Sequence, residues 1–279
     1  MYPIKKVMAI HDMSCYGRAS LTTIIPIIST MGIQVCPLPT TVLSTHTGGY
    51  GKPATDDLSN FMWDAHNHWK SLNLEFDCIY TGYLAGVNQA KLVKEIASNF
   101  IKENTLLVVD PVMGDDGELY SGFNEELITQ MRGVISHANI ITPNITEAVF
   151  LLGENYEDRF DTEKVDNWAI RLSEFGIENV VITSAPSIKG EKFIDNIIYD
   201  AKKKKLTRIS VEKINKYYPG TGDAFTSVLI GRILKNKSIE DASTFAGNFI
   251  SKAITKSNEF EYDSKEGILL EKVLNLLTK

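Results

Sequence analysis

Short apolar runs alternate along the chain with longer segments in which apolar residues recur every three or four positions. The short runs have the length and β-branched content of strands, and the longer segments have the spacing of helices that bury one face. Strands are predicted at residues 7–10, 33–36, 78–80, 106–109, 140–141 and 180–182. Helices are predicted at residues 21–31, 58–72, 88–103 and 224–234. Run 106–109 is apolar throughout, which is typical of a parallel strand covered on both faces.

The alternation of strands and helices predicts an α/β fold with a parallel sheet and right-handed crossovers. Between residues 192 and 211 the pattern changes to strand-like segments on either side of a lysine-rich turn, which indicates a small antiparallel hairpin. The chain has no low-complexity linker and no internal repeat. We therefore expect one domain over residues 1–279.

Composition narrows the class of protein. The chain has 279 residues, 43% of them hydrophobic and 23% charged, as in ordinary globular proteins. Its formal net charge of -6 argues against non-specific nucleic-acid binding, which needs a basic surface. The three cysteines lie far apart without zinc-ligand spacing, and the run after Met1 is too short for a leader or a membrane span. We expect a cytoplasmic enzyme with neither nucleic acid nor membrane as a partner.

Polar residues follow directly after the apolar runs. In a parallel sheet the carboxyl ends of the strands share one edge, and ligands collect there. The residues that this rule brings together are Asp12, Thr47, Thr81, Asp110, Thr142, Thr183 and Ser184. We expect the functional site at this edge.

The stretch 218–225, Tyr-Pro-Gly-Thr-Gly-Asp-Ala-Phe, is the most informative in the chain. Gly220 and Gly222 permit a tight turn, and a predicted helix follows, so its free N–H groups and positive dipole end would attract a phosphate. Asp223 lies in the first turn, either as a helix cap or as a proton acceptor for an attacking alcohol. Neither a Walker A loop nor a GxGxxG motif is present.

Phosphoryl transfer also needs charge neutralisation, which Mg²⁺ supplies through oxygen ligands. Asp110 and the segment Asn144-Ile145-Thr146-Glu147 offer such oxygens. Asn144 and Glu147 would share one face at a helix start. For Glu147 the alternative is a capping box with the preceding turn.

Taken in order, these motifs resemble the vitamin B6 kinase branch of the ribokinase-like superfamily. The resemblance rests on Pro-Gly-Thr-Gly-Asp at 219–223, Thr-Pro-Asn-Ile-Thr-Glu at 142–147 and Asp-Pro-Val-Met-Gly-Asp at 110–115. Ser-Thr-His-Thr-Gly at 44–48 and Thr-Gly-Tyr at 81–83 match the family's substrate loops. It extends over roughly residues 6 to 250 and implies a three-layer α/β/α fold with a central, mostly parallel sheet.

The resemblance implies ATP- and Mg²⁺-dependent phosphorylation of the 5′-hydroxymethyl group of pyridoxal, pyridoxine or pyridoxamine by a homodimer. A monovalent-ion requirement stays open. The resemblance assigns the following roles: Asp223 as general base with the Gly220, Thr221 and Gly222 backbone around the phosphoryl group; Asp110, Thr142 and Glu147 for the metal; Asn144, Thr183 and Ser184 for nucleotide phosphates; and Asp12, His46, Thr47, Gly48 and Tyr83 for the substrate ring.

One position departs from the B6 kinase pattern, which commonly has serine where this chain has Asp12. Asp12-Met13-Ser14 is similar to the start of the hydroxymethylpyrimidine kinases, and that activity is the alternative. A carboxylate only accepts hydrogen bonds, so Asp12 would favour a protonated ring or an amine, and hence pyridoxine or pyridoxamine over the aldehyde. Asp12 as a cap of the next helix is also open. His46 either donates to the substrate or only orders its loop.

Overall fold

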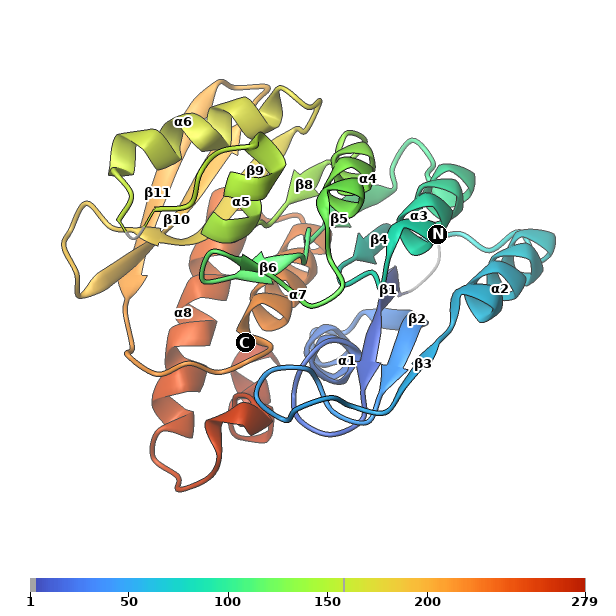
Figure 1. Cartoon of the computed structure of the whole chain (residues 1–279), viewed down its shortest axis with the longest axis horizontal. Coiled ribbons are helices and arrows are strands. Elements are labelled where there is room, and N and C mark those ends of the chain that lie inside the picture. Colours follow the sequence, from blue (N-terminus) through green and yellow to red (C-terminus); the bar gives the residue numbers. More distant parts are fainter. Residues whose placement is uncertain (1–3, 158, 279) are drawn as a thin grey trace.

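The computed structural model describes residues 4–157 and 159–278; Met1–Pro3, where the sequence predicts no leader, lie outside them. A large sheet forms its centre (Figure 1). From one edge to the other its strands are β11 (Lys205–Glu212), β10 (Phe193–Asp200), β9 (Asn179–Pro186), β8 (Ile140–Ile141), β5 (Leu106–Val109), β4 (Cys78–Thr81), β1 (Lys6–Ser14), β2 (Gln34–Leu43) and β3 (Thr55–Asp57). The strands from β9 to β2 are parallel, as predicted, and antiparallel pairs add β10, β11 and β3 at the edges.

Helices cover both faces of the sheet and give the expected three layers (Figure 1). They are α1 (Leu21–Thr30), α2 (Ser59–Ser71), α3 (Val87–Phe100), α4 (Glu125–Ile135), α5 (Ile145–Leu152), α6 (Thr162–Ser173), α7 (Thr221–Leu234) and α8 (Ile239–Ser257), with short 3₁₀ turns at Ser264–Glu266, Leu270–Lys272 and Leu274–Thr278. Helices α2 to α6 pack on one face, and α1, α7 and α8 pack on the other.

The alternation of side chains along each strand supplies both cores. In β1, Met8 and Ile10 join the core under α2 to α6, whereas Val7 and Ala9 join the core under α1, α7 and α8. All four side chains are fully buried. A strand that is apolar at every position therefore signals two covered faces, as the sequence pattern predicted.

Strand β2 is longer than the predicted run 33–36 and continues to Leu43 through Pro37 and Pro39. A proline cannot donate a ladder hydrogen bond, so it is tolerated where one side of a strand has no neighbour. Here β3 pairs with β2 only from Thr41 to Leu43, and the two prolines face β1 alone. The prolines made the strand look shorter than it is.

Two antiparallel hairpins complete the fold. The predicted one is β10 and β11, joined by the lysine-rich turn, and it extends the main sheet. The second joins β6 (Gly114–Asp115) to β7 (Glu118–Leu119). Its turn uses positive φ angles at Asp116 and Gly117, which suit a tight two-residue hairpin. This second hairpin follows Asp110 and stands over the start of α5, where Gly117 N donates to Thr146 Oγ1.

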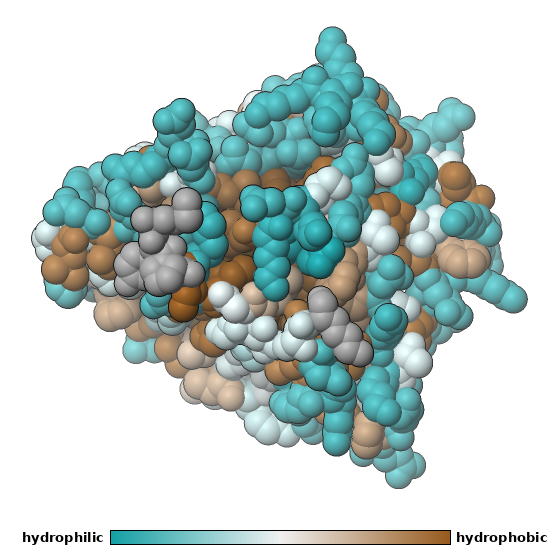
Figure 2. Space-filling view, turned by 180° about the vertical axis from the view of Figure 1, so that it is seen from behind, coloured by the Kyte–Doolittle hydropathy of each residue, from teal (hydrophilic) through white to brown (hydrophobic). Residues whose placement is uncertain are grey.

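The surface is largely hydrophilic, with apolar residues gathered in the middle of the face that Figure 2 shows, between hydrophilic side chains. Large apolar side chains that are exposed include Tyr16, Phe61, Trp63 and Leu72. Within residues 4–157 and 159–278, no helix combines the length and hydrophobicity that crossing a membrane requires.

Candidate active site

The polar residues that follow the strands meet at the carboxyl edge of the sheet, as the topology requires. Asp110 follows β5 and Thr142 follows β8, and the backbone N–H of each bonds to the neighbouring strand end. Helix α7 begins at the same edge, because Thr226 Oγ1 donates to Thr142 Oγ1 across 3.0 Å. The structure thus brings together two parts of the chain that are separated by about eighty residues.

The start of α7 is built around Gly220, which has φ +78° and precedes the helix. A Cβ there would lie 2.2 Å from the Arg18 carbonyl oxygen, so the loop after β1 rests directly on the glycine backbone. Thr221 and Gly222 form the first helical turn, three residues earlier than the predicted start. Their N–H groups have no intrahelical acceptor, which is the arrangement that binds an anion.

Asp223 does not cap its helix. One carboxylate oxygen, Oδ2, accepts from Ser20 N at 2.7 Å, and Oδ1 lies 3.1 Å from His11 Nε2. Its side chain is 12% exposed, so a substrate hydroxyl can reach the oxygen lone pairs that these donors leave free. Of the two interpretations of Asp223, the geometry excludes the helix cap.

Asp110, directly after β5, and Glu147, in the first turn of α5, form a buried pair of carboxyl groups. Burial and the nearby Asp223 carboxylate raise the pKa of Asp110 to about 7. Burial and Asp110 raise the pKa of Glu147 well above its ordinary value. The two acids cannot both ionise cheaply unless a nearby cation neutralises their charge.

The donor set also fits Mg²⁺ by its chemistry. Asp110, Glu147 and Thr142 offer only oxygen ligands. The described residues contain no group of three or more His, Cys, Asp or Glu side chains suited to holding a metal. Mg²⁺ needs no such cage, since it commonly takes one or two carboxylates, water and substrate phosphates.

Asn144 and Glu147 do form the capping box that the sequence left open. Asn144 Oδ1 accepts from Glu147 N, and Glu147 Oε2 accepts from Asn144 N, each at 2.8 Å. The Asn144 amide also donates to Gly114 O, and Met113 N donates to Glu147 Oε1. The box therefore fixes Glu147 beside Asp110 and ties α5 to the β6–β7 hairpin, so capping and metal binding are compatible for Glu147.

Thr183 and Ser184 lie in β9, close to the Pro143 backbone. Thr183 N donates to Pro143 O at 2.9 Å, and Ser184 has a positive φ of 56°, so the strand bends here. Ser184 is exposed and Thr183 half-buried. Their place beside Asn144 is consistent with a nucleotide phosphate, and that role stays a prediction.

The predicted ring-binding residues lie on or after β1, β2 and β4, whereas the predicted nucleotide residues Thr183 and Ser184 lie in β9. Asp12 lies within β1, where Oδ1 faces His11 and Oδ2 accepts from Ser14 Oγ. Helix α1 begins only at Leu21, so the idea that Asp12 caps it is wrong. Tyr83 is half-buried, and its ring packs against Phe123 at a centroid distance of 5.6 Å.

The loop 44–48 is held by His46. Its Nε2 lies 2.6 Å from Lys265 O, and its Nδ1 accepts from Gly48 N at 3.1 Å. Both ring nitrogens are engaged within the protein, which favours the loop-ordering interpretation over donation to a substrate. Thr47 and Gly48 are exposed next to it. That these two residues contact the substrate ring stays a prediction.

Sequence reasoning missed His11. It is 1% exposed in β1 and lies between Asp12 and Asp223. Burial would lower the pKa of this histidine, but the Asp223 charge and the hydrogen bond with Asp12 raise it to about 10. The only available signal was a histidine at a strand end directly before Asp12, because its partner Asp223 is distant in sequence.

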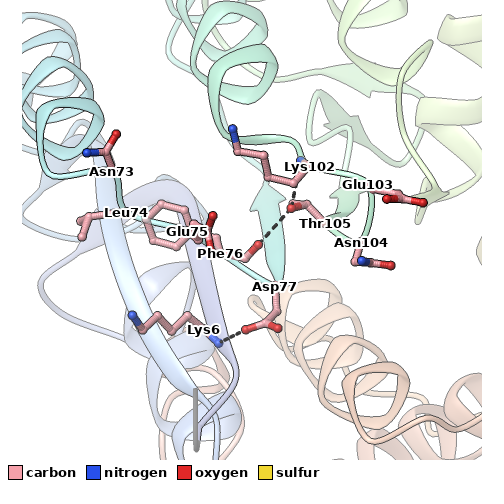
Figure 3. Close-up of a pocket in the computed structure, with 10 residues that line it drawn as sticks. All are labelled: Lys6, Asn73, Leu74, Glu75, Phe76, Asp77, Lys102, Glu103, Asn104 and Thr105. Carbon is pink, nitrogen blue, oxygen red and sulfur yellow. Dashed lines mark hydrogen bonds between the residues drawn. The ribbon is translucent and has the colours of Figure 1, made fainter. Parts of the chain in front are cut away.

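A hollow of about 610 Å³ lies at the amino edge of the sheet, away from the candidate active site (Figure 3). It is bordered by the starts of β1, β4 and β5, where Asp77 accepts from Lys6 N and Thr105 Oγ1 donates to Phe76 O. These bonds tie loops together. The carboxylates and the helix N-terminus described above lie at the other edge.

Comparison with known proteins agrees with this geometry. The family model described as phosphomethylpyrimidine kinase matches residues 66–269. The pyridoxal kinase of Dictyostelium discoideum is 30% identical over 280 residues, which cover 94% of this chain and 88% of that protein. The chain belongs to the pyridoxal kinase and phosphomethylpyrimidine kinase family. The predicted membership of the ribokinase-like superfamily is confirmed.

Solved structures of the family superpose over nearly the whole chain. A Bacteroides thetaiotaomicron protein, provisionally designated a phosphomethylpyrimidine kinase and crystallised with pyridoxal, is 41% identical with a TM-score of 0.94, over 99% of this chain and 96% of that one. The pyridoxal kinase of Lactobacillus plantarum is 28% identical with a TM-score of 0.90, over 98% and 96% of the two chains. The predicted fold class is confirmed.

Proposed function

We propose that this protein transfers the γ-phosphoryl group of ATP to the 5′-hydroxymethyl group of a B6 vitamer: pyridoxal, pyridoxine or pyridoxamine. The observation that carries the proposal is the placement of Asp223. Its carboxylate lies in the first turn of α7, beside the N–H groups of Thr221 and Gly222 and within reach of solvent. An acceptor for a hydroxyl proton thus adjoins a binding site for the transferring phosphoryl group.

The other site residues would bind the metal ion, the nucleotide and the substrate ring. Asp110, Thr142 and Glu147 would hold Mg²⁺, which when bound neutralises charge on the phosphates. Asn144, Thr183 and Ser184 would contact nucleotide phosphates. The backbone of Gly220, Thr221 and Gly222 would donate to the phosphoryl oxygens while Asp223 takes the proton from the substrate hydroxyl. On the other side, Asp12, Thr47, Gly48 and Tyr83 would orient the ring, and His46 would act by ordering the loop that carries Thr47 and Gly48.

Two observations support a B6 vitamer over the pyrimidine. The Dictyostelium relative, which aligns over almost the full chain, is a pyridoxal kinase. The 41% identical structure was obtained with pyridoxal although it carries the pyrimidine designation. The description of the matching family model keeps hydroxymethylpyrimidine as the second candidate substrate.

A direct comparison of substrates tests the proposal. Pyridoxal, pyridoxine, pyridoxamine and hydroxymethylpyrimidine are each incubated with ATP, Mg²⁺ and the purified protein, and the phosphorylated product is quantified. We expect the largest kcat/KM for a B6 vitamer, and a lower value for pyridoxal than for the other two vitamers if Asp12 contacts the ring. A larger kcat/KM for the pyrimidine, or no turnover of any vitamer, would contradict the proposal.

Binding of Mg²⁺ should depend on pH through Asp110. The pKa of Asp110 is raised to about 7, so the metal-free folded protein is more stable when this acid is protonated. That contribution to the free energy of unfolding is lost as the pH rises through about 7. Mg²⁺ binds the ionised form and so competes with the proton. We expect Mg²⁺ with ATP to raise Tm by about 3 °C more at about pH 8 than at about pH 6.

The measurement is thermal unfolding with Mg²⁺-ATP or with EDTA and ATP at both pH values. Asp110→Asn has no acid at position 110, so it should lose the part of the pH difference that comes from Asp110, although Glu147 still titrates in this variant. An equal Mg²⁺ effect at the two pH values in the unmodified protein would show that Asp110 is not a ligand.

Location in the cytoplasm and assembly as a homodimer stay predictions from the sequence, as does the open question of a monovalent ion. So does the prediction of a single domain over residues 1–279.

A further inference from the structure

His11 lies between two carboxylates that come from different parts of the chain. Its Nδ1 is 2.9 Å from Asp12 Oδ1, and its Nε2 is 3.1 Å from Asp223 Oδ1. An ionised carboxylate can only accept hydrogen bonds, so a ring nitrogen facing one must carry a proton. Backbone N–H groups also lie near the ring, with Asp12 N 3.1 Å from Nδ1 and Tyr83 N 3.4 Å from Nε2, but at each nitrogen the carboxylate oxygen is the closer partner. With a carboxylate closest to each nitrogen, the geometry calls for the doubly protonated imidazolium.

The surroundings strengthen this arrangement. The His11 side chain is 2% exposed, so water competes little for its two N–H groups. Despite the burial, which opposes the charge, the two carboxylates raise its pKa to about 10. A ring protonated at both nitrogens cannot accept a proton, and its charge would make it a strong donor to Asp223.

The end of β4 leaves room for this ring. A Cβ added to Gly82 would lie 1.9 Å from His11 Nε2, and Gly82 has no positive φ that would by itself call for glycine. The absence of a side chain at position 82 is thus explained by the imidazole that fills the space. Two neighbouring strands, β1 and β4, contribute to the placement of one ring.

We propose that His11 is a positioning residue for Asp223: anchored by Asp12 at Nδ1, it donates from Nε2 to Oδ1 and fixes the direction in which the carboxylate meets the substrate hydroxyl. The inference rests on the proposed function, in which Asp223 accepts the hydroxyl proton. Ser20 N holds Oδ2, so two donors of different origin define the plane of the carboxylate. The lone pairs that remain would be free to accept from the substrate hydroxyl.

Two substitutions separate this role from a merely structural one. The amide nitrogen of His11→Asn takes the place of Nδ1, so it keeps a bond to Asp12 and loses the one to Asp223. The amide nitrogen of His11→Gln takes the place of Nε2 and can still donate to Asp223. We expect kcat to fall about 10- to 100-fold in His11→Asn with a smaller change in KM, and His11→Gln to recover most of the loss.

Thermal unfolding of both variants, with and without Mg²⁺-ATP, controls for folding. Equal losses of kcat in the two variants, an unchanged kcat in His11→Asn, or an effect confined to KM would overturn the inference.

A measurement without turnover keeps this inference separate from the proposed function. We expect ¹⁵N NMR of the unmodified protein to show both His11 ring nitrogens protonated at neutral pH, and Asp223→Asn to lower the pKa of the ring. If the protein phosphorylates no vitamer, the proposed function fails, and the NMR result then decides whether His11 pairs with Asp223. A neutral His11 ring in the unmodified protein would overturn the pairing whatever the activity.

Discussion

Replacing Asp223 by Asn is expected to lower kcat for the B6 vitamer about 10²- to 10⁴-fold, the usual contribution of a positioned general base. The amide has nearly the same shape and can still accept from Ser20 N, so the fold and the start of α7 should persist. What it loses is the capacity to take the hydroxyl proton. KM for the vitamer and for ATP should change far less than kcat, and steady-state kinetics measure both.

Asp241→Asn is the matched control for this experiment. Asp241 also occupies the third residue of its helix, α8, and its side chain is 47% exposed in an ion pair with Arg232. We expect its kcat to match that of the unmodified protein. A loss below about 10-fold in Asp223→Asn, or a similar loss in both variants, would remove Asp223 from the role of base.

The second large effect is expected for Gly220→Ala. At φ +78° an alanine is strained, and its Cβ would lie 2.2 Å from the Arg18 carbonyl oxygen, which is backbone and cannot turn aside. Strain and overpacking together should lower the free energy of unfolding by about 2–4 kcal/mol. The loop that carries Ser20 must also move away from Asp223, and a displacement of about 1 Å at an active site costs about 10²-fold in rate.

Gly222→Ala is the control for stability, two residues away in the same sequence motif. Gly222 lies within the first turn of α7, and a Cβ there would meet no atom within 4 Å. Because alanine is the better helix former, we expect its unfolding free energy to stay level or rise by up to about 1 kcal/mol. Denaturant unfolding measures both variants. Equal destabilisation of Gly220→Ala and Gly222→Ala would show that the close contact between Gly220 and Arg18 is not the reason for a glycine at position 220.

Most of the sheet could be predicted from the sequence because its signal is local. The runs 78–80, 106–109 and 140–141 became β4, β5 and β8 within a residue of the prediction. A strand covered on both faces is apolar at every position. This pattern can be recognised in the sequence without knowing which strands lie next to it. Strand β2 was underestimated because the effect of Pro37 and Pro39 depends on whether a neighbour pairs with that side.

Much of the candidate site could be predicted for the same reason. A glycine-rich turn before a helix, and carboxylates directly after buried strands, owe their properties to residues adjacent in the chain. Asp223 and Asp110 were selected on this basis, and Glu147 was selected for its spacing of three from Asn144 at a helix start. The structure brings Asp110 and Glu147 together as a buried pair near Asp223.

Only the tertiary structure decided how these groups act on one another. Whether Asp223 caps a helix or presents its carboxylate depends on Ser20, about two hundred residues away, and on His11. The pKa of a buried group depends on which charges lie within a few ångströms, a distance that sequence separation does not give. By itself, then, the sequence determined the sheet, the glycine-rich start of α7 and the family of the protein. Folding determined the protonated His11 between two carboxylates, because its partners meet only when β1, β4 and α7 pack together.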